Sequence, residues 1–483
     1  MADINEDFGL RLINFDPGRP DPTMFSTASE AMLASVSIVP PAPVPWPSEW
    51  RPIPDPPNDL PTDRDPLPKR EVLIVTWTAG EARTLATLMM GDNFDNWIEY
   101  RSNLEEFIPK VTGPKAPFNI GVSRYRHTLG LYFPLKIGGI SALAFKSGLH
   151  MAYDGPDMPV VDLWRQIIAE VQPKLVITTG TGGGIGADVQ LGDVIVTGTT
   201  RFHLTTYLKT KPFAEASYAS APFDGAAIKE LITTALLKPN GDRLQTPRIP
   251  EIIVPPTPTD VIVTTDNFAF DDSTNYYRLQ GLGKCCDMGD ATLGLATSTI
   301  GASAPSWVAI RNASDPQIPN LSGDISAAHK EAGNIYSKYQ MVTTGGSVVA
   351  SWATVVARFP DRALPALQFA EERVPAVEIP RPLETAETVL LAMTAAKSST
   401  RCDVAIDRLP LPALAALKTQ LQLENVHFES SSIDTAEIRF TDMIDNEHVL
   451  YAVDVHNSDA AKFMATYVIF RGTIVAKFKA VSS

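Results

Sequence analysis

Short apolar runs alternate with longer amphipathic segments through the middle of the chain. Runs of about five or six apolar residues, too short for helices, predict buried strands over 71–76, 130–134, 140–145, 175–179, 193–197, 261–265 and 306–311. Segments with apolar residues three or four positions apart predict helices over 78–89, 160–171, 226–237, 291–300 and 327–359, the last broken at Gly345-Gly346. Strand, helix and strand in succession predict a parallel sheet with helices on its faces.

A glycine-rich segment follows the run at 175–179. Gly180–Gly186 holds five glycines in seven positions and predicts a turn whose backbone can approach a ligand closely. A turn without a ligand remains the alternative. Gly182-x-Gly184-x-x-Ala187 fits the loose dinucleotide motif, but the sequence predicts another strand, over 193–197, where that motif requires a helix.

Proline content divides the chain into four parts. Residues 1–69 contain fifteen of the forty prolines and predict an extended arm that wraps the surface, anchored by Trp46 and Trp50. A flexible linker or a recognition ligand for another protein are the alternatives. Residues 70–360 form the main domain, 361–383 read as a linker, and 384–483 predict a small α+β domain of unknown role. In it, two helices, over 384–397 and 412–423, precede strands that include a hairpin around Arg471-Gly472-Thr473.

Composition and net charge limit the classes of partner and the cellular location that the chain is expected to have. The 483 residues are 44% hydrophobic and 20% charged, with a net charge of −14, which disfavours nucleic acid or an anionic membrane as partner. No apolar run reaches the length of a membrane helix, and the N-terminus lacks the pattern of a signal peptide. Three cysteines without metal-type spacing are expected to be free thiols in the cytoplasm.

Several motifs then occur in a fixed order along the main domain. They are Thr179-Gly-Thr-Gly-Gly183, Gly192-Asp-Val-Ile-Val196, Arg201-Phe-His203, Asp266-Asn-Phe268, Met288 and Arg311-Asn-Ala-Ser314-Asp315. This set resembles the nucleoside phosphorylase and nucleosidase superfamily, most closely the methylthioadenosine/S-adenosylhomocysteine nucleosidases. The resemblance covers roughly residues 70–360. It implies an α/β fold in which helices flank a central mixed β-sheet.

The resemblance also implies roles for individual residues. Asp315 would protonate N7 of a purine as general acid, and Glu81 would position and deprotonate the attacking water. The remaining positions would bind substrate: Thr181, Gly182 and Gly183 around ribose and base, Phe268 stacked on the base, Met288 under the sugar, and Ser314. A glutamate at the start of a helix can equally be a charge that complements the helix dipole.

One position departs from the family pattern. Gly289 stands where the nucleosidases carry a ribose-binding glutamate, and Asp290 follows it. Glycine can let the chain turn the next residue inward, so Asp290 is predicted to accept hydrogen bonds from the ribose hydroxyls. Otherwise Asp290 caps the helix that begins at Ala291. His150 is expected to lie on a loop facing solvent.

The predicted activity is hydrolysis of the N-glycosidic bond of a purine nucleoside or related metabolite, without metal or organic cofactor. The expected partners are a small nucleoside substrate and further copies of the chain, in a dimer or larger homo-oligomer. A phosphate-dependent phosphorylase is the first alternative: Thr178 occupies the place of a phosphorylase arginine, but Arg83 could substitute. A nucleoside-binding sensor or scaffold without catalytic activity is the second.

Overall fold

A computed structural model of the chain divides it into two compact units, residues 1–368 and 369–483. In the first unit it describes residues 13, 38–57, 61–91, 93–114, 116–120, 126–244, 246, 248–254 and 261–363. In the second it describes residues 401–402, 417–419, 421–422, 431–441, 447–457, 462–470 and 473–479.

The first unit is organised around one mixed sheet. Its thirteen described strands are β1 (Pro52–Pro54), β2 (Val72–Thr76), β3 (Ile98–Tyr100), β4 (Gly130–Ile137), β5 (Ile140–Ser147), β6 (Leu175–Gly184), β7 (Val194–Thr197), β8 (Thr199–His203), β9 (Ser217–Ala219), β10 (Ile252–Ile253), β11 (Ile262–Thr265), β12 (Cys285–Asp287) and β13 (Ser306–Asp315). The main path runs β1-β4-β5-β2-β6-β12-β11-β8-β9, while β13 pairs with both β6 and β7. The central pairs β2–β5, β2–β6 and β6–β13 are parallel, as the alternation of strands and helices predicts.

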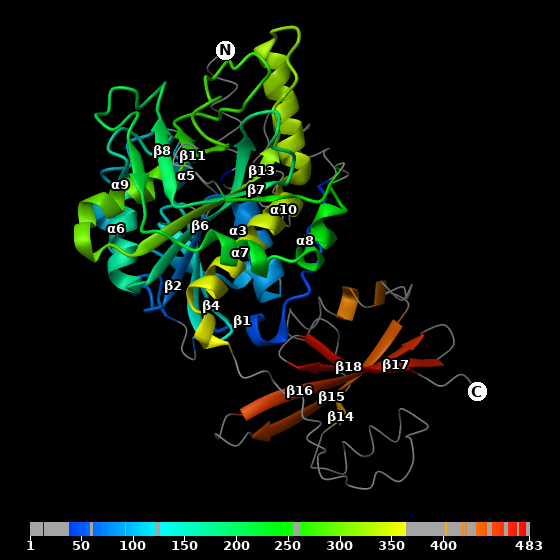
Figure 1. The fold of residues 1–483 in the computed structure, drawn as a ribbon. Helices are drawn as coiled ribbons and strands as arrows, with labels where there is room; N and C mark the ends of the chain where they lie inside the picture. The colour runs from blue at the N-terminus through cyan, green and yellow to red at the C-terminus, as the bar shows by residue number, and fades with distance from the viewer. Residues whose placement is uncertain are drawn as a thin grey trace. The chain divides into compact units, whose positions relative to one another are not determined.

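Helices cover both faces of this sheet (Figure 1). They are α3 (Ala79–Met90), α4 (Leu104–Phe107), α5 (Pro117–Ile120), α6 (Pro159–Val171), α7 (Gly225–Leu231), α8 (Thr234–Gly241), α9 (Ala291–Ile300) and α10 (Ile325–Arg358), with short 3₁₀ turns at Ser48–Trp50, Phe94–Asn96, Gly301–Ser303 and Pro360–Arg362. Successive residues of β2 belong to different cores: Val72 and Ile74 pack with α3 and α10, and Leu73 and Val75 with α6 and α9. The predicted α/β class, with a central mixed sheet flanked by helices, is confirmed.

The glycine-rich segment is a strand and not the predicted turn. β6 continues through Gly180 to Gly184 and pairs with β13 on one side and with β12 at its end. A Cβ atom at Gly180 would lie 2.2 Å from Glu81 Oε1, and one at Gly182 would lie 2.5 Å from the Cys285 sulfur. Glycine is therefore required for close packing within the sheet and against α3.

Two helix predictions also need correction. The helix predicted over 226–237 is interrupted, because α7 ends at Leu231 and α8 begins at Thr234. The break predicted at Gly345-Gly346 is wrong, since α10 continues through both. A Cβ on Gly345 would lie 2.8 Å from the Asn240 side chain, so these glycines let α10 approach its neighbours.

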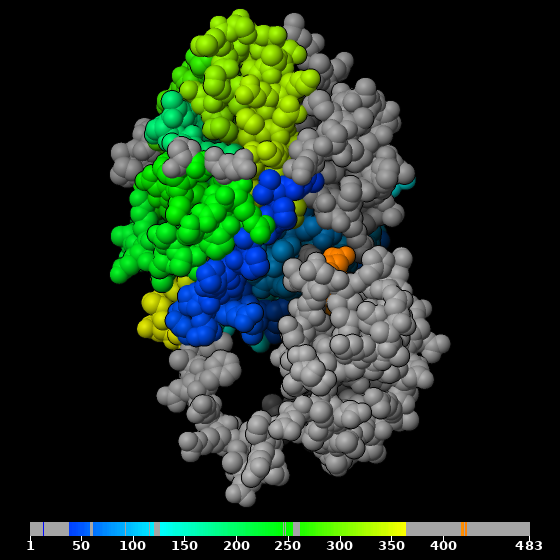
Figure 2. Space-filling model, turned by 90° about the vertical axis from the view of Figure 1, so that its right-hand side faces the viewer, coloured from blue at the N-terminus to red at the C-terminus, as the bar shows by residue number. Residues whose placement is uncertain are grey.

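The described part of the proline-rich arm lies on the surface of the first unit (Figure 2, blue). Ala42 exchanges two hydrogen bonds with the Asn240 side chain, and β1 pairs with β4. The Trp46 and Trp352 rings are 5.4 Å apart, and the Trp352 indole donates to the Trp50 carbonyl. These contacts agree with an arm anchored by two indoles.

The strands of the second unit are described as backbone. Strands β14 (Arg401–Cys402), β15 (Ser431–Thr441), β16 (Glu447–Asn457), β17 (Lys462–Phe470) and β18 (Thr473–Lys479) form a five-stranded antiparallel sheet in that order. The hairpin predicted around Arg471-Gly472-Thr473 is confirmed as β17–β18. The predicted helix over 384–397 lies outside the described residues, as does most of that over 412–423.

In the part of the chain that the structure describes, no helix combines the length and hydropathy required to cross a membrane.

The arm contacts predict unequal effects for two of its residues. Trp50 is 8% exposed, so Trp50→Ala should lower the free energy of unfolding of the first unit by about 3–5 kcal/mol. Ile53, 40% exposed in the same arm, is the matched control, and Ile53→Ala should cost less than about 1 kcal/mol. Urea unfolding followed by circular dichroism checks this, and equal effects would contradict the anchoring role.

Candidate active site

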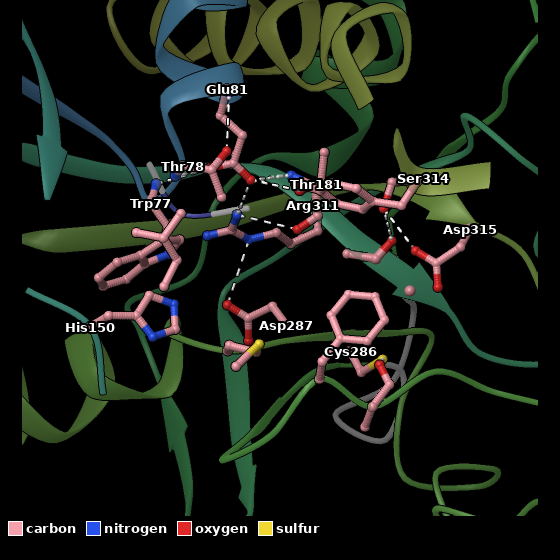
Figure 3. Close-up of a pocket in the computed structure, with 17 residues that line it drawn as sticks. Trp77, Thr78, Glu81, His150, Thr181, Cys286, Asp287, Arg311, Ser314 and Asp315 are labelled. Atoms are coloured by element: carbon pink, nitrogen blue, oxygen red, sulfur yellow. Dashed lines mark hydrogen bonds and ion pairs between the residues drawn. The ribbon is translucent and has the colours of Figure 1, made fainter. Parts of the chain in front are cut away.

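A cavity lies where β6 and β13 end beside the start of α3 (Figure 3). Its empty volume is about 590 Å³, including the part open to solvent. The residues that line it come from strands β6, β12 and β13, from the loops that follow β2, β5, β11 and β12, from α3 and α10, and from position 13: Ile13, Trp77, Thr78, Glu81, His150, Thr181, Gly182, Gly183, Phe268, Ala269, Cys286, Asp287, Met288, Arg311, Ser314, Asp315 and Tyr336. Parallel pairing brings this wall together, because Asp315 pairs with Gly183 across β13 and β6.

Glu81 joins the start of α3 to the end of β6. Its Oε2 accepts from the backbone N–H groups of Trp77 and Thr78, and the Thr78 hydroxyl completes a capping box. Its Oε1 accepts from the Thr181 N–H and hydroxyl, both at 2.7 Å. The carboxylate is thus both a helix-capping group and part of the cavity wall.

Arg311 is a buried cation shared by three carboxylates. Its guanidinium binds Asp290 through Nε and Nη2, and lies 3.5 Å from Glu81 and 3.7 Å from Asp287. The side chain is only 1% exposed, so little water screens these pairs. Burial, followed by the charge of Asp290, raises the pKa of Asp287.

The structure does not bring Asp290 into the cavity wall. Its carboxylate is fully buried and accepts from Arg311 and from the Trp77 indole at 3.2 Å. No hydrogen bond from its side chain caps α9; Asp287 instead accepts from the N–H groups of Gly289 and Asp290. Neither expected role of Asp290 is therefore seen among these contacts.

Trp77 occupies the space beside Gly289. A Cβ atom at position 289 would lie 2.4 Å from the Trp77 ring, so no side chain fits there without moving the indole. The indole is held by its bond to Asp290 and by an edge contact with Trp164 at 5.9 Å. The Trp77 indole thus fills the space that a side chain at position 289 would need.

Asp315 is the acid at the other end of the cavity. Its Oδ1 accepts from the Ser314 hydroxyl at 2.9 Å, and that hydroxyl also contacts the Gly182 carbonyl. Burial raises the pKa of Asp315 to about 7, against the opposing effect of the Ser314 hydrogen bond. Among the described residues, no group donates to Oδ2, which therefore remains available to a ligand.

An aromatic group stands beside this acid. Phe268 lines the cavity and meets the Tyr336 ring edge-on at 6.4 Å. The Tyr336 hydroxyl lies 3.4 Å from the Thr181 hydroxyl, and burial raises its pKa. Phe268 and Met288, both partly buried, thus lie where a flat ligand can contact them.

The expectation that His150 faces solvent is wrong. It is 4% exposed and lines the cavity below Trp77, with ring centroids 6.0 Å apart (Figure 3). Burial, with the charges of Lys146 and Arg311, lowers the pKa of His150 to about 3. The imidazole is therefore neutral near pH 7.

Eight of the nine site residues expected from the sequence line the cavity. They are Glu81, Thr181, Gly182, Gly183, Phe268, Met288, Ser314 and Asp315, while Asp290 stands behind the wall. Sequence reasoning gave no site role to Ile13, Trp77, His150, Asp287, Arg311 or Tyr336. Trp77 could have been suspected from its place between the first strand and Glu81, but nothing near Tyr336 in the sequence signals a site.

Cations are scarce around the cavity. Of its described lining residues only Arg311 carries a permanent positive charge. Arg83 does not line the cavity; it pairs with Asp95 at 2.9 Å and lies over the Phe94 ring. Thr178 is buried inside β6. Among the described residues, no group of three or more His, Cys, Asp or Glu side chains could hold a metal ion.

Comparisons with known proteins agree with the sequence motifs. Residues 136–334 match the Phosphorylase superfamily, which confirms the resemblance to nucleoside phosphorylases and nucleosidases over that part of the chain. No curated protein matches significantly.

Solved structures with detectable similarity come from several bacteria. They include the 5′-methylthioadenosine/S-adenosylhomocysteine nucleosidase of Neisseria meningitidis with methylthio-immucillin-A (16% identity, 59% of this chain and 97% of that chain, TM-score 0.35), futalosine hydrolase of Helicobacter pylori (12%, 59% and 97%, 0.35) and the corresponding nucleosidase of Colwellia psychrerythraea with adenine (16%, 58% and 96%, 0.32).

The Arg311 cluster predicts a pH-dependent stability defect. Arg311→Met leaves three buried carboxylates without their cation and should cost about 3–5 kcal/mol at pH 7.5. Without the cation, burial and repulsion raise the folded-state carboxylate pKa values above the unfolded ones. The folded variant then binds more protons than the unfolded chain, so its stability falls as pH rises and the deficit should shrink at pH 5.

Urea unfolding of the first unit at both pH values measures this difference. The control is Arg64→Met, which removes an exposed pair with Glu105 and should change stability by less than about 1 kcal/mol at either pH. A deficit for Arg311→Met that is equal at pH 5 and pH 7.5 would contradict the charge argument.

Proposed function

We propose that this protein, whose residues 136–334 match the Phosphorylase superfamily, hydrolyses the N-glycosidic bond of a purine nucleoside or related metabolite. One observation carries the proposal. The cavity places a carboxyl group with a raised pKa at one end and an anionic, arginine-bound cluster at the other, and its described lining residues include no uncommitted cation. Cleavage of this bond requires such an asymmetry, since the base gains negative charge and the sugar positive charge.

Asp315 is the proposed general acid. A group with a pKa of about 7 is partly protonated at neutral pH, and its Oδ2 is open to a ligand. It would donate its proton to purine N7 as the C–N bond breaks, so that the base leaves neutral. Ser314 holds the other oxygen and sets the orientation of the carboxyl group.

Phe268 gives the base a surface beside this acid. Its neighbour Ala269 lies close to Gly183, which pairs with Asp315, and the Phe268 ring is kept in place by edge contacts with His329 and Tyr336. Stacking on a base stabilises binding by about 1–3 kcal/mol in other nucleotide-binding sites. The proposed orientation therefore has the base near Phe268 and the sugar toward Trp77 and Met288.

Glu81 and Thr181 would act on the sugar and water. The Glu81 carboxylate already accepts from five donors, one of them Arg311 Nη1, and its negative charge stabilises an oxocarbenium-like sugar. The Thr181 hydroxyl can rotate toward the Tyr336 oxygen, which frees one lone pair on Glu81 for the attacking water. The water oxygen then bonds to the anomeric carbon and its proton passes to Glu81.

Water is favoured over phosphate as the nucleophile. Phosphate requires free cations or the free N–H groups of a helix N-terminus. The Arg311 guanidinium is already bound to carboxylates and the Thr181 carbonyl, and the start of α3 is already capped by Thr78 and Glu81. An incoming phosphate would face the Glu81 carboxylate without a compensating charge. Phosphorolysis is therefore the weaker of the two reactions for this cavity.

A nucleoside-binding protein without activity is the second candidate function. The observation in its favour is Gly289, which removes the family's ribose-binding carboxylate, together with the Trp77 ring that fills the space beside it. The pKa of Asp315 favours the enzyme, because a protein that only binds has no need of a proton donor at this position.

Three further proposals concern the cellular location, the oligomeric state and the role of residues 384–483. Cys285 and Cys286 are buried free thiols, which agrees with a reducing cytoplasm. A homo-oligomer remains our proposal for the assembly, and light scattering tests it. We also propose that residues 384–483 lie outside the chemistry, because none of the matched motifs falls in them.

The first functional prediction concerns the nucleophile. Purified protein should release free base from purine nucleosides in phosphate-free buffer, and added phosphate should leave the rate unchanged. Chromatography of base and sugar products measures this. Formation of sugar 1-phosphate, or release only when phosphate is present, would show that the reaction is phosphorolysis.

The second functional prediction concerns Asp315 as the general acid. Asp315 must be protonated to act, so kcat should fall as pH rises through about 7. Asp315→Asn should lower kcat by about 10²–10⁴-fold and abolish this limb of the profile, while nucleoside binding persists. The control Asp188→Asn removes an exposed acid paired with Lys284 and should leave kcat unchanged. An unaltered pH profile in Asp315→Asn would exclude Asp315 as the acid.

A further inference from the structure

An aromatic wall closes the end of the cavity opposite Asp315, and the inference drawn from it rests on the proposed nucleosidase function. Trp77 and His150 form this wall, their rings nearly perpendicular at 76°, and Tyr153 packs behind His150 at 5.3 Å. In the proposed orientation this wall faces the sugar. Its polar groups therefore decide how sugar hydroxyls are recognised.

The wall leaves no space for an acceptor carboxylate from position 289. A Cβ at Gly289 would clash with ring atoms of Trp77, and those atoms are held by Trp164 and by the bond to Asp290. Asp290 itself is bound to Arg311. A hydroxyl at this end must find another partner.

His150 is the available partner. Its Nδ1 is fully enclosed and has no hydrogen-bond partner among the described residues. A buried N–H without an acceptor is rarer and costlier than a buried lone pair, so the proton of the neutral ring belongs on Nε2. Since Nδ1 is enclosed, the ring edge that meets the cavity carries Nε2, and Figure 3 shows the ring facing the space beside Asp287.

We propose that His150 determines specificity by donating a hydrogen bond from Nε2–H to a hydroxyl oxygen of the substrate's sugar. A donor at this position replaces the acceptor carboxylate that Trp77 and Gly289 exclude. One imidazole N–H donates to one hydroxyl, whereas a carboxylate can accept from two. Removal of one particular sugar hydroxyl should therefore lower kcat/KM strongly, and removal of either of the others should lower it little.

Single substitutions of His150 are combined with nucleosides that each lack one hydroxyl to test this contact. Wild type, His150→Phe and His150→Gln are compared for kcat/KM with adenosine and its 2′-deoxy, 3′-deoxy and 5′-deoxy analogues, and for the Kd of adenine by calorimetry. Phenylalanine keeps the ring and removes the donor, while glutamine keeps a donor of similar reach. His203→Phe is the matched control, since His203 lies on β8 and does not line the cavity.

His150→Phe should lower kcat/KM for adenosine about 10-fold, with His150→Gln recovering part of the loss. For one deoxy analogue, wild type and His150→Phe should have equal kcat/KM, which identifies the hydroxyl that is bound. The Kd of adenine should not change in any variant. Equal losses for all four nucleosides, or weaker adenine binding, would overturn the proposal and leave His150 as a packing residue.

Failure of this contact and failure of the proposed function give different results. If the wild type releases no base, the Kd of each nucleoside replaces kcat/KM, and loss of one hydroxyl contact in His150→Phe would still support the proposal. A wild type that binds adenine but shows no preference among the four nucleosides would overturn it. Absence of binding by adenine and all nucleosides would overturn both.

Discussion

The arrangement of the cavity depends on one buried cation. Arg311 is enclosed at the centre of the first unit, where it neutralises part of the charge of Glu81, Asp287 and Asp290. Without it these buried carboxylates would be costly, because each one that carries a charge would lose its hydration and repel the others. The guanidinium thereby fixes where α3, β6 and α9 meet.

Close backbone approach makes this cluster possible. β6 crosses the centre of the sheet as a run of threonines and glycines, and its parallel pairing with β13 places Arg311 opposite Gly180. A Cβ on Gly180 would fall 2.6 Å from the Arg311 guanidinium and nearer still to the Glu81 carboxylate. The glycines therefore admit the charged groups, and the charged groups then hold the glycine-rich strand to α3.

The residues predicted well from the sequence are those whose role is local. Short apolar runs indicated the buried strands correctly, and the motif Arg311-Asn-Ala-Ser314-Asp315 indicated the end of one. The roles of Asp290 and His150 could not be read in this way. Asp290 turns away from the cavity because Arg311 and Trp77, distant in sequence, bind it, and His150 is buried because Trp77 and Tyr153 cover it. In both cases Trp77, far away in the sequence, is one of the groups that set the position.

The most direct measurement is a crystal structure with a hydrolysis-resistant purine nucleoside analogue in which carbon replaces the glycosidic nitrogen. The account predicts purine N7 within about 2.6–3.2 Å of Asp315 Oδ2, the base on Phe268 and the sugar facing Glu81, Trp77 and His150. A base bound at the Trp77 end, or an analogue bound outside this cavity, would contradict it.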